Sequence, residues 1–148
     1  MITKTVKMHY CEFCKKKGQR SDIIKKHERG CTNNPNRICG MCKLADEDTE
    51  QITPMEAVKL IDVTKIEDNE YSITVSCSIK RLQKETTCPA CILAALRYLS
   101  KVHSTSEVSA WVNQEEKFVF KDEVASLWAE VNDAAQREEY DNMRYGCY

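Results

Sequence analysis

The segment YCEFCKKKGQRSDIIKKHERGC, residues 10–31, carries three cysteines and one histidine at the spacing C-x2-C-x12-H-x3-C. The four candidate ligands are Cys11, Cys14, His27 and Cys31. Two thiolates on one tight turn can hold one edge of a tetrahedral ion, and two ligands one helical turn apart can hold the other. The spacing therefore predicts a metal site, and the mixed set of three cysteines and one histidine favours zinc over iron or copper. The alternative is that His27 is an ordinary surface histidine on a basic helix.

The residues around these ligands predict a short helix. Ser21 is a suitable N-cap, and Gly30 is placed to end the helix so that Cys31 can turn inward. Ile23 and Ile24 can be buried beneath the site. Four protein ligands leave no open coordination position, so the metal is expected to fold the segment rather than to perform chemistry.

Two further C-x-x-C pairs, Cys39/Cys42 and Cys88/Cys91, predict a second zinc site made of four cysteines. Lengthening the loop between two ligand pairs from about 15 to about 45 residues costs only about 1 kcal/mol. That cost is small against the roughly 10 kcal/mol that a structural zinc contributes. The competing interpretation is a redox dithiol, because CPAC opens a helix whose N-terminus would lower a thiol pKa. Thioredoxin-like folds also place a cis-proline later in the chain, and no proline follows residue 89.

Charge divides the chain into a basic head, residues 1–43, and an acidic body, residues 44–148. The head has 11 Lys/Arg and 3 Asp/Glu, whereas the body has 11 Lys/Arg and 20 Asp/Glu. The same boundary predicts two domains, a zinc-finger and knuckle module followed by a mostly helical body, joined through the shared four-cysteine site. A head of this charge indicates an anionic partner, or attraction between head and body.

The basic residues of the head predict contact with the phosphates of a nucleic acid. In the usual finger register Arg20, Ile23 and Lys26 would face the bases, and the aliphatic Ile23 suits base reading poorly. One finger addresses only about 3 base pairs, so we do not expect sequence-specific binding by this module alone. The alternatives are a solvated basic face or one that docks on the acidic body. The predicted contact residues are Lys15, Lys16, Lys17, Arg20, Lys25, Lys26, Arg29 and Arg37.

The body is predicted to be mostly helical, with few short strands. Thr53 and Glu56 form a capping box that starts a helix. Residues 71–79 alternate between apolar and polar, which indicates a strand. Another helix follows Cys88, and residues 118–140 predict a short strand and then a helix. The expected fold is a small α-rich domain of the α+β type, stapled by two zinc ions.

The composition, 42% hydrophobic and 30% charged, is typical of a soluble globular protein. The start MITKTVKMHY lacks the apolar core of a signal peptide, and no apolar run is long enough to cross a membrane, so we expect a cytoplasmic protein. The sequence has no G-x-S-x-G, no phosphate-binding glycine loop and no paired-histidine motif. We therefore expect no enzymatic activity, with a thiol oxidoreductase that uses Cys88 and Cys91 as a remote alternative.

Three runs of the sequence are informative together: HYCEFCKKKGQRSDIIKKHERGCTNNPNRICGMC, CPACILAALRY and FVFKDEVASLWAEVNDAAQREEYDNMRYG. In this order they resemble a family of small C2HC-type zinc-finger proteins from bacteriophages and prophages. The likeness covers most of the chain, with residues 44–87 the least similar, and Thr87 stands where asparagine is expected. The resemblance implies two zinc sites on the eight ligands named above and a phage context, but no mechanism.

Two functions are compatible with these features. The leading hypothesis is a non-enzymatic phage accessory protein that binds zinc and contacts nucleic acid through the basic finger. The alternative is an adaptor or inhibitor that binds a host protein, with the acidic body as the interaction surface.

Overall fold

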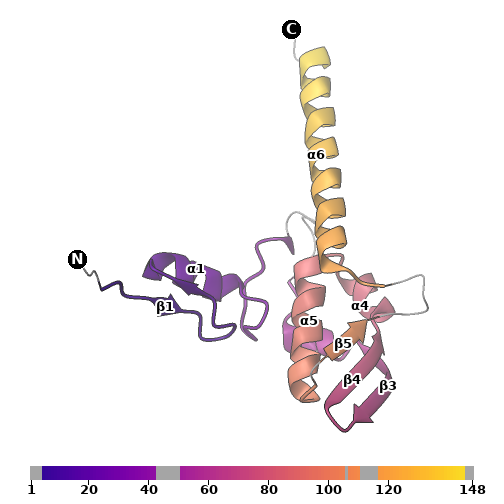
Figure 1. Ribbon diagram of the computed structural model, residues 1–148. Coiled ribbons are helices and arrows are strands. Elements are labelled where there is room, and N and C mark those ends of the chain that lie inside the picture. Colours follow the sequence, from indigo (N-terminus) through magenta and orange to yellow (C-terminus); the bar gives the residue numbers. More distant parts are fainter. Residues whose placement is uncertain (1–4, 43–50, 106, 111–116, 146–148) are drawn as a thin grey trace.

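The computed structural model describes residues 5–42, 51–105, 107–110 and 117–145. A small module near the N-terminus lies beside a larger body, from which one long helix projects (Figure 1). The module contains β1 (His9–Tyr10), β2 (Lys17–Gly18) and α1 (Ser21–Gly30). The body contains α3 (Pro54–Val58), β3 (Asp62–Asn69), β4 (Ser72–Ser78), α4 (Lys80–Glu85), α5 (Pro89–Val102), β5 (Glu107–Ala110) and α6 (Phe120–Tyr145).

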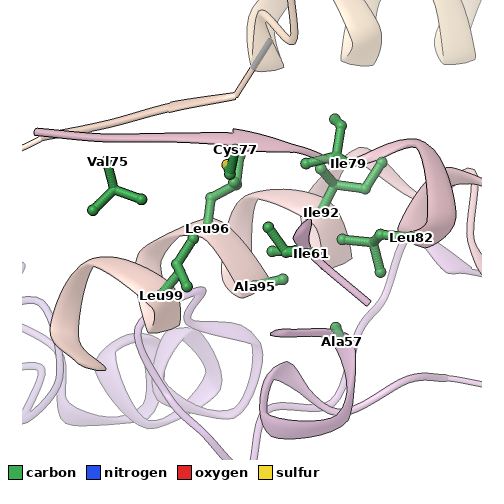
Figure 2. Packing of buried hydrophobic residues seen from close by; sticks show 10 residues of the cluster. All are labelled: Ala57, Ile61, Val75, Cys77, Ile79, Leu82, Ile92, Ala95, Leu96 and Leu99. Carbon is green, nitrogen blue, oxygen red and sulfur yellow. The ribbon is translucent and has the colours of Figure 1, made fainter. Parts of the chain in front are cut away.

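The body is a three-stranded sheet packed against helices. Its strand order is β3-β4-β5, in which β3 pairs with β4 antiparallel and β4 pairs with β5 parallel. A parallel pair needs a crossover connection, and α4 and α5 supply it. The main core lies between β4 and α5, with α3 and α4 closing its edges (Figure 2). It consists of Ala57, Ile61, Val75, Cys77, Ile79, Leu82, Ile92, Ala95, Leu96 and Leu99.

Several sequence predictions for the body are confirmed. Thr53 and Glu56 form the capping box at the start of α3, with the Glu56 backbone N–H donating to Thr53 Oγ1 over 3.3 Å. The alternating segment forms β4, with Val75 and Cys77 buried on one face. Helix α5 begins at Pro89, with Cys88 as its N-cap, as predicted.

The prediction of an α-rich fold of the α+β type holds in rough terms. Helical residues outnumber strand residues in the described chain, and the body also contains a three-stranded sheet. All eight residues of β3 are exposed, so this strand has no apolar alternation that the sequence could reveal. The short strand expected just after residue 117 is wrong, because α6 already begins at Phe120 and the third strand, β5, comes earlier in the chain.

The long helix α6 packs against the body near its start. Leu127 is buried, whereas Trp128 is 45% exposed and residues 132–138 are all exposed. The later turns of α6 extend away from the body (Figure 1). The apolar stripe of this helix is therefore only partly covered.

Leu82→Ala is expected to destabilise the body by about 2–5 kcal/mol, because it opens a cavity in a close-packed core. The Leu82 side chain on α4 is fully buried. Val102→Ala, in the last turn of α5, is the matched control, because Val102 is 59% exposed and its truncation should change stability by less than about 0.5 kcal/mol. Urea unfolding followed by circular dichroism measures both. Equal losses in the two variants would contradict the core described above.

Candidate metal centres

The first cluster brings together the four predicted ligands of the finger. The ligand atoms of Cys11, Cys14, His27 and Cys31 all lie within 4.8 Å of one another, and Sγ of Cys14 is 3.1 Å from Nε2 of His27. Zinc–sulfur bonds of about 2.3 Å in a tetrahedron place two sulfurs about 3.8 Å apart, so the spacing suits a single ion. Cys11 and Cys31 are buried, whereas Cys14 and His27 are half-buried.

Local hydrogen bonds shape the turn that carries the first two thiols. The Lys15 backbone N–H donates to the Cys11 carbonyl over 3.0 Å, and the Cys11 N–H donates to the Lys16 carbonyl over 2.8 Å. Lys15 takes a positive φ of 61°, which folds the chain tightly between β1 and β2. The two thiols of the C-x-x-C pair consequently point to one place.

Helix α1 supplies the other two ligands and ends as predicted, with Gly30 last and Cys31 as its C-cap. Two details differ from expectation. The N-cap is Arg20, not Ser21, because the helix already begins at Ser21. Ile23 is 51% exposed, and only Ile24 is buried beneath the cluster.

The second cluster joins the head to the body. The sulfurs of Cys39, Cys42, Cys88 and Cys91 lie within 4.8 Å of one another, and all four residues are buried. Cys39 Sγ is 3.5 Å from Cys88 Sγ, and Cys42 Sγ is 3.4 Å from Cys91 Sγ. Each close pair therefore links the CGMC knuckle to the start of α5, across 49 residues.

Three polar residues hold this cluster in place. No pattern in the sequence indicates this role. Thr86 Oγ1 accepts a hydrogen bond from the Cys88 N–H over 3.2 Å and so sets the start of α5. Gln51 accepts from the Cys39 N–H over 2.8 Å and donates to the Arg37 carbonyl. The Arg37 guanidinium donates to Cys91 Sγ over 3.4 Å. No short motif marks Gln51 or Arg37, because their partners lie 12, 14 and 54 residues away in the chain.

The ionisation of the thiols fits a cation at each cluster. At the first, burial raises the pKa of Cys14, but hydrogen bonds from the Lys16 backbone and from His27 outweigh it and lower that pKa to about 6. At the second, hydrogen bonds from the neighbouring thiols Cys88 and Cys91 lower the pKa of Cys39, whereas hydrogen bonds to Cys39 and Cys88 raise the pKa of Cys91. Thiols this close cannot all ionise unless a cation lies among them. The donor sets, three cysteines with one histidine and four cysteines, are those of structural zinc sites.

The burial of the CPAC motif does not suit the redox interpretation. Cys88 is 0% and Cys91 is 2% exposed, whereas a catalytic thiolate must be reached by a disulfide substrate. The eight cysteines in the described residues are free thiols. The arrangement therefore favours metal binding by Cys88 and Cys91 over thiol exchange.

The predicted nucleic-acid contacts fall into two groups. Seven of the eight side chains are exposed on the finger: Lys15, Lys16, Lys17, Arg20, Lys25, Lys26 and Arg29. Arg37 is only 5% exposed and lies against the second cluster. Its prediction as a phosphate contact is wrong, because burial keeps its guanidinium from a nucleic acid.

The fold and the two clusters define a small α+β protein with two cysteine-rich sites, each able to hold a metal ion. Comparisons with known protein families, with curated proteins and with solved structures found no match to this chain. In the described residues, no helix is long and apolar enough to cross a membrane.

Proposed function

We propose that this protein is a non-enzymatic, cytoplasmic zinc protein that contacts nucleic acid through the basic face of its finger. Two structural Zn²⁺ ions fold it, one at each cluster, and neither performs chemistry. Its role is that of a phage accessory protein, in line with the resemblance described above. The binding follows the phosphate backbone and does not read sequence.

The observation that carries this proposal is the outward face of α1. Ile24, His27 and Cys31 recur at helical spacing and turn toward the first cluster, so Lys25, Lys26 and Arg29 lie on the opposite side. These three cations are exposed. A metal at the first cluster would thus hold a row of cations in a fixed arrangement on the surface.

The acidic residues of the finger leave most of these cations free to bind an anionic ligand. Asp22 pairs with Arg20 through an ion pair of 2.6 Å, and Glu28 accepts a hydrogen bond from the Glu12 backbone N–H. Within the described ranges, Lys16, Lys17, Lys25, Lys26 and Arg29 form no ion pair. Their exposure is also the opposite of what docking on the acidic body would produce. Such cations are suited to phosphate oxygens.

The test neutralises three finger lysines, in Lys16→Gln/Lys25→Gln/Lys26→Gln, and measures binding to random-sequence duplex and single-stranded oligonucleotides by fluorescence anisotropy. Each lost phosphate contact removes about 0.9 from the slope of log K against log salt for duplex DNA, and about 0.7 for a single strand. We expect the slope to fall by about 2–3 and the affinity at low salt to fall at least about 10-fold.

The matched control is Lys59→Gln/Lys84→Gln/Lys121→Gln, which removes the same charge from exposed lysines of the body. It should bind as the wild type does, apart from a small long-range effect. Equal losses in the two triple variants would show that binding is not local to the finger. No binding by the wild type at low salt would reject the proposal.

A second candidate function has one observation in its favour. Helix α6 presents the half-exposed Trp128, and the same helix carries the exposed acidic residues Glu123, Glu130 and Asp133. Exposed tryptophan is a common anchor of protein interfaces. An adaptor or inhibitor would use this surface, so Trp128→Ala should abolish capture of a discrete protein partner and leave oligonucleotide binding unchanged.

A further inference from the structure

Arg37 is buried, and among the described residues its hydrogen-bond partners include no carboxylate. Its Nε donates to the Gly30 carbonyl over 3.5 Å, and its Nη1 donates to Cys91 Sγ over 3.4 Å. In the part of the chain that the structure describes, no ion pair includes Arg37. Arginine is almost never buried without a negatively charged partner, because removing its charge from water costs several kcal/mol.

The partner that the structure offers is the second cluster itself. Four thiolates around a divalent ion keep a net charge of about −2, whereas three thiolates and a neutral histidine keep about −1. In the described residues, only the more negative of the two centres has a buried cation hydrogen-bonded to one of its sulfurs.

The chain around Arg37 holds its guanidinium beside the second cluster, where a positive charge offsets the negative charge of the thiolates. The segment after α1 folds back on the end of that helix: Asn34 Nδ2 donates to the Glu28 carbonyl over 2.8 Å, and the Ile38 N–H donates to the Arg29 carbonyl over 2.7 Å. With the bond from Arg37 to Gly30, the carbonyls of residues 28–30 are all satisfied. A cation at this end is also favoured by the helix dipole. Arg37 is thereby held between the finger helix and the thiols.

We propose that Arg37 is a positioning residue that compensates the charge of the second metal centre, and that it slows release of the metal through its hydrogen bond to the Cys91 sulfur. The proposal rests on metal binding by this cluster and is independent of nucleic-acid binding. A charge-assisted hydrogen bond of this kind should change the rate of metal loss roughly 10- to 100-fold.

The experiment uses zinc-loaded full-length protein, a competing chelator and a thiol-alkylating reagent, with labelled cysteines mapped by mass spectrometry over time. In Arg37→Gln, which keeps an N–H donor but loses the charge, Cys88 and Cys91 should be alkylated roughly 10- to 100-fold faster than in the wild type. Arg37→Lys, which keeps the charge, should stay within a few-fold of the wild type. Arg29→Gln removes an exposed finger charge and should leave these rates unchanged.

Alkylation of Cys77 distinguishes the proposed charge role of Arg37 from a general loss of stability. Cys77 is buried in β4 and belongs to neither cluster, so its alkylation reports opening of the body core. The proposal requires faster labelling of Cys88 and Cys91 in Arg37→Gln in the presence of the chelator, while without chelator, with the metal bound, Cys77 is labelled at the wild-type rate. Faster labelling of Cys77 in the metal-loaded variant without chelator would overturn it and assign Arg37 a packing role.

Two other results are decisive if Arg37→Gln does not fold. A folded, metal-loaded Arg37→Lys would then support the need for a positive charge, and failure of both variants would overturn the charge role. A wild-type protein that holds no metal at the second cluster, as found by elemental analysis, would remove the basis of the proposal.

Discussion

Cys88→Ala is expected to unfold the body under conditions in which Cys77→Ala leaves it folded. Both side chains are fully buried, but only Cys88 is a candidate ligand. A structural zinc contributes roughly 10 kcal/mol or more to folding, which is as much as the entire stability of an ordinary domain. The ligand also lies at the start of α5, the helix that supplies Ile92 and Leu96 to the main core. Loss of the metal should therefore spread into the core.

Cys77→Ala removes one buried sulfur from the same core and should cost only about 1 kcal/mol. The measurement is circular dichroism of both variants, together with zinc content by elemental analysis. We expect two zinc ions per chain in the wild type and in Cys77→Ala. If Cys88→Ala kept its helical signal and its stability within about 1 kcal/mol of Cys77→Ala, the second centre would not be a folding element.

His27→Ala should release the metal of the first centre and unfold the finger while the body remains folded. The buried residues of the finger are Cys11, Ile24 and Cys31, a cluster separate from the main core. Such a small apolar cluster cannot offset the conformational entropy of ordering the segment without a metal. The expected product holds one zinc ion per chain, loses amide protection in residues 9–31, and keeps it in β4 and α5.

His103→Ala is the control, because His103 follows α5 and belongs to neither cluster. It should keep two zinc ions and a protected finger. The proposed function adds that His27→Ala loses the salt-dependent binding of oligonucleotides, since the row of cations on α1 is no longer held. Unfolding of the whole protein by His27→Ala would contradict the independence of the two centres.

Local spacing explains why the first centre could be predicted ligand by ligand. Cys11 and Cys14 share one turn, and His27 and Cys31 are one helical turn apart, so the geometry is built into the order of the chain. Elements with local signals were predicted equally well, such as the capping box at Thr53 and the alternation in β4. The exposed strand β3 carries no such signal, because its hydrogen bonds to β4, and not burial of its side chains, make it a strand.

The sequence by itself determined the eight candidate ligands, the division of charge between head and body, and the helices that begin at local caps, because each depends on residues that are near one another in the chain. The tertiary structure alone decided the pairing of β5 with β4, the exposure of Ile23 and Trp128, and the burial of Arg37 against Cys91. Arg37 shows the physical reason most clearly. A basic residue in a basic segment indicates a solvated surface, and only the approach of the Cys91 thiol, 54 residues away in the chain, makes it a buried cation.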